Sequence, residues 1–212
     1  MAQRTDGRVE RGNQTRRAIL GRSMQIASVE GLAGLSLGRV ATELEISKSG
    51  VFALFGSMEE LQLATVRAAI AVFVEHVVTP SADLPAGAGR LWRICLDWIA
   101  YSRGRVFEGG CFFATVSAEF DARASGPVRD LVVTANRDWF GFLEATAGEA
   151  IDAGSMRAGT DPAQLAFELN AFLDTANMLS LLQGDDAAYD RAAVAIGDRL
   201  RTAATDPATV PG

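Results

Sequence analysis

The sequence predicts an all-α protein, with an N-terminal three-helix head that contains a helix-turn-helix and a larger C-terminal helical bundle as its body. Apolar residues recur at helical spacing along most of the 212 residues, and no stretch shows the alternation of a β-strand. Two short amphipathic helices joined by a tight turn occupy residues 36–55. Basic side chains are concentrated in the first 50 residues, whereas the rest of the chain is acidic.

The head is predicted to span residues 13–56, after a polar and unpatterned stretch, residues 1–12, that we interpret as a mobile arm. Its first helix begins at about Asn13, a residue type that favours the N-cap position. The helix ends at Glu30, because Gly31 is suited to the left-handed conformation that follows many helices.

The helix-turn-helix comes next, and each of its two helices carries one apolar stripe. Ser36 and Ser47 precede the helices, where a side-chain oxygen satisfies the first backbone amides. Residues 45–47 lie between them, which leaves room only for a tight turn. Both stripes have the spacing i, i+3, i+4 and i+7, and they consist of Leu37, Val40, Ala41 and Leu44, then Val51, Leu54, Phe55 and Met58.

The body is predicted to span residues 57–204. Ser57 and Glu60 form a capping box that starts a long helix, and Asp161 with Pro162 provides the N-cap and first residue of another. The second of these helices is apolar on nearly all sides, which indicates that a second subunit covers one side. The expected helices cover about residues 57–78, 86–103, 111–120, 127–151, 161–183 and 187–204, and residues 205–212 are expected to form a disordered tail.

The composition indicates a globular protein, since 49% of the residues are hydrophobic and 22% are charged. No apolar run approaches the length of a membrane span, and the N-terminus lacks the apolar segment of a secretory signal. Cys95 and Cys111 form no close-spaced ligand pair, and we expect them to be reduced thiols. These features together predict a cytoplasmic protein.

The charge is unevenly distributed along the chain. Residues 1–50 contain eight Lys or Arg and five acidic residues, a balance of +3, whereas the other 162 residues have a balance of −9. A basic head on an acidic body keeps the attraction for a polyanion at one end of the molecule. The alternative is that Arg4, Arg8 and Arg11 merely solubilise the arm.

No enzyme signature stands out in the sequence. His76 is the only histidine, and the chain contains no GxGxxG, P-loop or GxSxG motif. Four carboxylates of the body could meet in a pocket, but nothing in the sequence pairs them: Asp97, Glu108, Glu119 and Asp121. We therefore predict that the protein is not an enzyme and has neither a cofactor nor a metal site.

The head resembles the N-terminal domain of the tetracycline-repressor (TetR) family of transcriptional regulators, from about Asn13 to Leu63. The order of elements carries the resemblance: a helix opened by residues 16–20, a glycine break at Gly31, the helix-turn-helix, and a capped helix opened by residues 57–61. The resemblance implies a ligand-responsive regulator, usually a repressor that a small-molecule effector releases from palindromic double-stranded DNA. The aromatic residues of the body favour a small apolar or aromatic effector. It also implies a homodimer formed by the last two helices, about residues 161–204.

Two sets of candidate site residues follow. For DNA binding we expect the exposed face of the second helix of the motif, with supporting residues around it: Arg16, Arg17, Ser36, Arg39, Thr42, Ser47, Lys48, Ser49, Gly50, Phe52 and Ala53. For the effector, the helices that surround the family's ligand cavity carry aromatic and sulfur-containing residues. Each of them taken singly is better explained as plain core, but together they favour an apolar pocket: Trp92, Cys95, Trp98, Phe107, Cys111, Phe112, Phe113, Phe120, Trp139, Phe142 and Met178.

Two other functions remain open at this point. Glu45, Phe52, Leu54 and Gly56 replace glycine, tyrosine or lysine that the family often has near the DNA, and this favours a small-molecule binding protein or enzyme with weak or lost DNA affinity. A helical bundle that acts only as a protein-interaction module is the other alternative. Binding to DNA upstream of the protein's own gene distinguishes both from a regulator.

Overall fold

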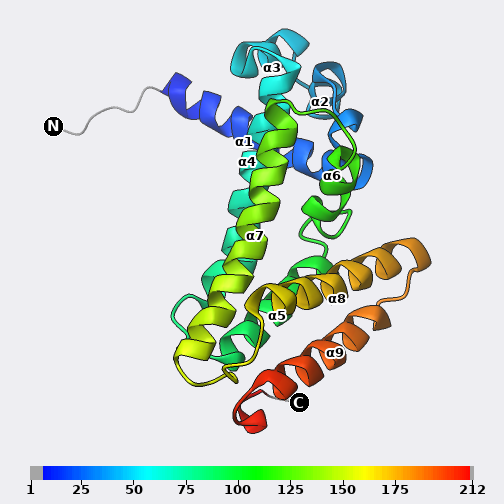
Figure 1. Cartoon of the computed structure of the whole chain (residues 1–212). Helices are drawn as coiled ribbons and strands as arrows, with labels where there is room; N and C mark the ends of the chain where they lie inside the picture. The colour runs from blue at the N-terminus through cyan, green and yellow to red at the C-terminus, as the bar shows by residue number, and fades with distance from the viewer. Residues whose placement is uncertain (1–6, 211–212) are drawn as a thin grey trace, which may run out of the picture.

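The structure is a computed structural model that describes residues 7–210, and every regular element in that range is helical (Figure 1). The predicted fold class is confirmed. The α-helices are α1 (Gly7–Glu30), α2 (Leu37–Glu43), α3 (Lys48–Phe55), α4 (Met58–Phe73), α5 (Ala88–Arg103), α6 (Phe112–Phe120), α7 (Pro127–Asp152), α8 (Pro162–Gln183) and α9 (Ala187–Ala203). Short 3₁₀ turns cover Leu32–Gly34, Thr79–Ser81 and Pro207–Thr209, and a π-helical turn, Val74–Val78, extends α4.

The head, formed by α1, α2 and α3, lies at one end of an elongated molecule (Figure 1). The long helices α4 and α7 run side by side from the head to the opposite end. There α5 packs against the π-helical turn that extends α4 and against α7, α8 and α9, and α8 and α9 pack against each other as the last helical pair. The helix α6 contacts both α1 and α7, so it lies where head and body meet.

The stripes predicted for the helix-turn-helix form the core of the head. Val40 and Val51 are fully buried, and they pack in one cluster with Ile19 of α1. The predicted N-caps are confirmed: the Ser36 hydroxyl accepts a hydrogen bond from the amide of Arg39, and the Ser47 hydroxyl accepts one from the amide of Gly50. These caps satisfy amides that no helical carbonyl can reach.

The body begins with a second set of predicted caps. The Ser57 hydroxyl accepts from the amide of Glu60 at the start of α4, and Asp161 accepts from two amides at the start of α8. Contrary to the sequence prediction, one segment, Met58–Ser81, is long and apolar enough to cross a membrane. It is instead a core helix, because Leu61 and Val66 are fully buried against the neighbouring helices.

Two predictions about the chain ends need correction. Helix α1 begins at Gly7 and not at about Asn13, so residues 7–12 belong to a helix and not to an arm. The rest of the predicted arm, residues 1–6 including Arg4, lies outside the described residues. At the other end Pro207–Thr209 forms a 3₁₀ turn and Val210 is buried, so this part of the expected tail packs on the body.

The turn of the helix-turn-helix holds one residue in the left-handed region. Glu45 has φ of 55°, while its amide donates to the carbonyl of Thr42 and the next amide, of Ile46, donates to Ala41. A side chain with a Cβ is disfavoured in this conformation, whereas glycine adopts it without cost. The geometry therefore explains why glycine is common at this turn in the family that the head resembles.

We predict that Glu45→Gly raises the free energy of unfolding by about 1 kcal/mol, because glycine removes the left-handed strain. Thermal denaturation followed by circular dichroism should show a melting temperature higher by about 2–4 °C. Glu45→Ala is the matched control, since it removes the carboxylate but keeps a Cβ at positive φ. Equal stability of the two variants would contradict this account of the turn.

Candidate DNA interface and ligand cavity

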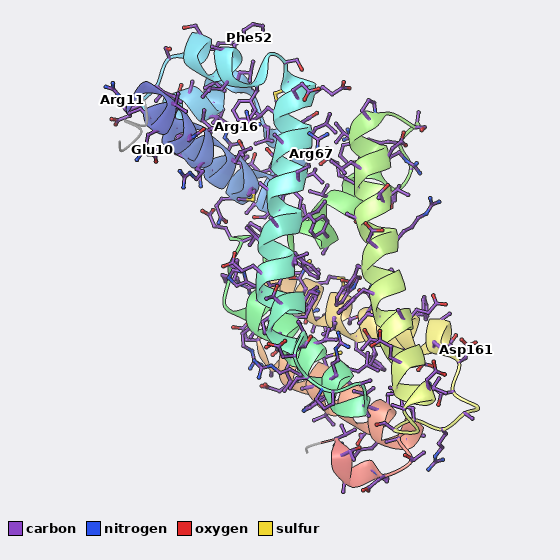
Figure 2. The ribbon with its side chains drawn as sticks, turned by 90° about the vertical axis from the view of Figure 1, so that its left-hand side faces the viewer. Glu10, Arg11, Arg16, Phe52, Arg67 and Asp161 are labelled. Carbon is purple, nitrogen blue, oxygen red and sulfur yellow. The ribbon has the colours of Figure 1, made fainter. Side chains whose placement is uncertain are left out.

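One face of α3 packs into the core of the head, and the other face is exposed at the end of the molecule. Val51 and Phe55 point into the core, while Lys48, Ser49 and Ala53 are exposed. Phe52 is 54% exposed, and Figure 2 shows it at the end of the molecule that lies away from Asp161 at the start of α8. The exposed face therefore offers one cation, a hydroxyl, small side chains and an aromatic ring.

Two arginines that we expected at DNA have partners inside the head. Arg16 donates to the carbonyl of Leu54 at 2.9 Å, and its guanidinium lies 4.4 Å from the centroid of the Phe55 ring. These contacts fasten α1 to α3. Arg16 is thereby a positioning residue in this structure, and a phosphate would have to compete for its guanidinium.

Arg39 is the centre of an ion-pair network on the side of the head. It pairs with Glu30 at 2.6 Å and with Glu43 at 2.9 Å, and it also donates to the carbonyl of Gly34 at 3.2 Å. Hydrogen bonding to Arg39 lowers the pKa of Glu30, and hydrogen bonds from Arg22 and Arg39 lower the pKa of Glu43. The network joins α1 to α2, so Arg39 also acts within the head.

The remaining candidates of the head divide into capping residues and exposed ones. Ser36 and Ser47 cap α2 and α3, and the Thr42 hydroxyl donates to the carbonyl of Gly38 at 3.0 Å. The side chain of Arg17 is 74% exposed, with Glu10 at 3.6 Å. Lys48 is exposed and makes no ion pair with any described residue, which leaves its ammonium available to a phosphate.

The body contains a cavity of about 630 Å³ between α4, α5, α6, α7 and α8. This volume is within the range of small-molecule sites. Six of the predicted ligand residues line it, namely Trp98, Cys111, Phe113, Trp139, Phe142 and Met178. The other five do not line it: Cys95, Phe107 and Phe112 are core residues, Phe120 borders a separate surface hollow, and Trp92 packs against the core.

The sequence reading missed Phe73, the ring around which the aromatic wall of the cavity is arranged. Its centroid lies 5.0 Å from that of Trp139 and 5.8 Å from that of Phe113, both edge to face. Phe73 belongs to α4, together with the cavity residues Ile70 and Val74. Its place on the apolar side of α4 is the sequence signal that could have identified it.

A polar relay crosses the same wall. Trp139 Nε1 donates to Asn170 Oδ1 at 2.8 Å, and Asn170 Nδ2 donates to Asp174 Oδ2 at 2.8 Å. The surrounding protein raises the pKa of Asp174 by displacing water from the carboxylate, although the Asn170 hydrogen bond opposes the shift. Asn170 and Asp174 are polar residues on a helix that is apolar nearly all round, and this contrast could have marked them.

The two cysteines are not reactive groups. Burial raises the pKa of both the Cys95 and the Cys111 thiol to about 12, so both are protonated at neutral pH. Cys111 lines the cavity as a small apolar surface.

Behind the cavity, Asn177 ties α8 to the loop 104–111, which joins α5 to α6. Asn177 is 3% exposed, and its Oδ1 accepts from the amide of Cys111 at 2.9 Å and from the hydroxyl of Ser102 at 2.8 Å. Gly110 has φ of 74°, and a Cβ there would lie 2.2 Å from Asn177 Oδ1. Only glycine permits this approach, so the loop is held against a residue that also lines the cavity.

The same loop is hydrogen-bonded to α1 of the head. The amide of Gly109 donates to the Ser28 hydroxyl at 3.1 Å, and a Cβ on Gly109 would lie 1.9 Å from the Ser28 carbonyl oxygen. Gln25 accepts from the amide of Glu108 at 2.7 Å and donates to the carbonyl of Val106 at 3.1 Å. Gly109 and Gly110 therefore allow close contact on two sides of the loop, with α1 and with Asn177.

Helix α6 adds a second attachment. Thr115 donates to the carbonyl of Ser28 at 2.8 Å, and Glu119 accepts from the amide of Ala33 at 3.0 Å. Glu119 also pairs with Arg123 at 2.9 Å. Glu119 is thus a link between body and head and not part of a catalytic carboxylate pair.

Comparison with known proteins decides the family. The model of the tetracyclin repressor-like C-terminal domain matches residues 87–196, which is more than half of the chain. The chain belongs to the TetR family of transcriptional regulators. The resemblance found in the head is thereby confirmed from the body, and the family is one of regulators and not of enzymes.

Solved structures of this TetR-family fold agree over nearly the whole chain. A TetR transcriptional regulator from Chloroflexus aurantiacus superposes with a TM-score of 0.83 at 20% identity, over 92% of this chain and 98% of that one. A TetR-family regulator from Streptomyces coelicolor gives 0.76 at 18% identity, over 90% and 96%. AibR, solved with isovaleryl coenzyme A and operator DNA, gives 0.69 at 21% identity, over 86% and 96%. No curated protein matches the chain significantly.

We predict that Asn177→Ala lowers the free energy of unfolding by about 2–3 kcal/mol, since it leaves the buried Cys111 amide without its acceptor and leaves the Ser102 hydroxyl only Tyr189 as a partner. Urea denaturation followed by circular dichroism measures the change. Asn170→Ala, on the same helix but only half-buried, is the control and should cost less than about 1 kcal/mol. Equal losses in the two variants would show that Asn177 has no special structural role.

Proposed function

We propose that this regulator is a ligand-responsive repressor that acts as a homodimer on a near-palindromic operator. The observation that carries the proposal is that the cavity and the head are built on shared elements. Helix α4 lines the cavity and follows the helix-turn-helix directly, and the loop 104–111 is hydrogen-bonded both to Asn177 of the cavity and to α1 of the head. AibR, which shares the fold, was solved with both a small molecule and operator DNA.

In the proposed complex α3 enters the major groove of DNA. Lys48 and Ser49 contact phosphate or base edges, while Gly50 and Ala53 allow close approach. Arg17 lies exposed on the neighbouring helix α1, where it can reach a second phosphate. Thr42, Ser36 and Ser47 hold the backbone of the motif in place, and Phe52 offers an apolar contact to the groove.

The proposed dimer uses α8 and α9. Phe167 and Leu182 lie along one side of α8 and are 61% and 77% exposed, and Val194 of α9 is 62% exposed. Large apolar side chains in this number on two neighbouring helices indicate a surface that a partner covers. A second copy covers it with the same two helices, and the twofold axis places two heads for two half-sites.

Two physical routes connect ligand and head in this proposal. The ligand contacts α4 directly through Ile70 and Phe73, and Gly56, at φ of 77°, is the joint between α4 and α3. It also contacts Asn177, which holds the loop 104–111 against α1. The ligand shifts the heads only as far as its affinity differs between their two arrangements.

We predict that Lys48→Ala weakens binding to DNA from upstream of the protein's own gene. It should also reduce the slope of log affinity against log salt by about 1 for each subunit, because one phosphate contact is lost. A mobility-shift titration at several salt concentrations measures both quantities.

Arg157→Ala is the control, because it removes the same charge from the loop between α7 and α8, at the opposite end of the molecule from α3 (Figure 1). Unchanged affinity and slope for Lys48→Ala would refute its assigned contact. If the wild type binds the upstream DNA no more tightly than random DNA, the alternative of a small-molecule binding protein is favoured. That alternative is also supported by the contacts of Arg16 and Arg39 inside the head and by the exposed Glu45.

We predict that Leu182→Glu shifts the protein from dimer to monomer, with dimer affinity reduced at least about tenfold, because the dimer would bury a carboxylate. Sedimentation velocity over a range of micromolar concentrations measures the shift. Leu84→Glu, at an exposed leucine in the loop before α5, should leave the dimer intact. A wild type that is monomeric throughout this range would remove the basis of the proposed interface.

A further inference from the structure

We propose that the ligand of the cavity is an organic cation, an amine or quaternary ammonium carried on an apolar or aromatic body. The inference rests on the proposed ligand-binding function and adds the charge of the ligand. Three features of the cavity wall support it: the sign of its charges, the rings beside them, and the fixed position of one carboxylate.

The charges of the cavity wall all have one sign. Asp138 of α7 and Asp174 of α8 line the cavity, and no Lys, Arg or His is among the described residues that do so. Both residues line the cavity, so a ligand bound in it can reach their carboxylates. An anionic ligand would meet two negative charges and no cation, whereas a positively charged one meets two counterions.

Aromatic rings line the same cavity as these carboxylates. Trp139 follows Asp138 in the chain, and its ring is stacked on that of Phe142 with centroids 6.1 Å apart. Phe73 completes the wall at 5.0 Å from Trp139. The faces of such rings attract ammonium groups, and the attraction grows where water is excluded. The rings also provide the apolar surface on which the body of the ligand packs.

Asp174 is held in place without a cation of its own. Its Oδ2 accepts from Asn170 Nδ2, and Asn170 is fixed in turn by the indole of Trp139. No ion pair joins Asp174 to a described basic residue. The carboxylate is thus held in one position and has no counterion among the described residues. The loss of water around it raises its pKa. A cation bound there replaces that lost solvation.

The test uses two probe ions of the same shape and opposite charge, tetraphenylphosphonium and tetraphenylborate. Isothermal titration calorimetry of the full-length protein with each ion measures the charge preference directly. The proposal predicts that the phosphonium ion binds at least about tenfold more tightly than the borate ion, as expected for a charge facing counterions in a partly desolvated site.

Asp174→Asn separates the carboxylate from the shape of the site, because the amide keeps an oxygen that can accept from Asn170. This variant should lose most of the phosphonium preference, about tenfold. Glu144→Gln is the matched control: it removes one negative charge from an exposed position of α7 outside the cavity, and its preference should equal that of the wild type. A thermal melt of each variant establishes that it is folded.

Equal binding of both ions, tighter binding of the borate, or no saturable binding of the phosphonium would overturn the proposal. A preference for the phosphonium ion that survives in both Asp174→Asn and Asp138→Asn would overturn it as well. The preference would then arise from groups other than these two carboxylates. None of these results touches DNA binding, which the upstream DNA titration tests without any ligand. Failure of that titration would refute the proposed repressor function and leave the charge preference standing.

Discussion

The amide oxygen of Asn177 accepts two buried hydrogen bonds, from the Cys111 amide and the Ser102 hydroxyl, and the position of the loop 104–111 depends on them. The approach is possible only because Gly110 lacks a side chain. From this fixed loop, backbone amides at 108 and 109 reach Gln25 and Ser28 of α1. The buried side-chain amide of Asn177 therefore positions the loop that contacts the head, and Asn177 also forms part of the cavity wall.

This arrangement gives the two ends of the molecule different physical characters. The head is held together by its own contacts, with Arg16 joining α1 to α3 and Arg39 joining α1 to α2. Its attachment to the body combines the packing of α1 on α4 and α6 with directional hydrogen bonds to the loop 104–111 and to α6. An interaction of that kind has discrete alternatives, so a small change at the cavity can favour a second placement of the head.

Much of the fold followed from local rules. The stripes at helical spacing and the caps at Ser36, Ser47 and Ser57 gave the helices of the head and the start of α4, because these signals act within a few residues. The cavity was predictable only in part, because lining a cavity is a property of packing. Trp139 lines the cavity while Phe112 is core, although both lie on predicted helices. Asn177, Gly109 and Gly110 were beyond sequence reasoning, since their partners lie on distant helices.

The central claim is that the cavity and the DNA face are coupled through the contact between the loop 104–111 and α1. Its most direct test is a fluorescence anisotropy titration of the upstream DNA, with and without saturating tetraphenylphosphonium, for the wild type and for Ser28→Ala. That substitution removes the acceptor of the Gly109 amide and touches neither the cavity wall nor α3. The account predicts that the cation weakens DNA binding by the wild type at least about fivefold and by the variant much less. An equal change in both proteins, or none in the wild type, would contradict it.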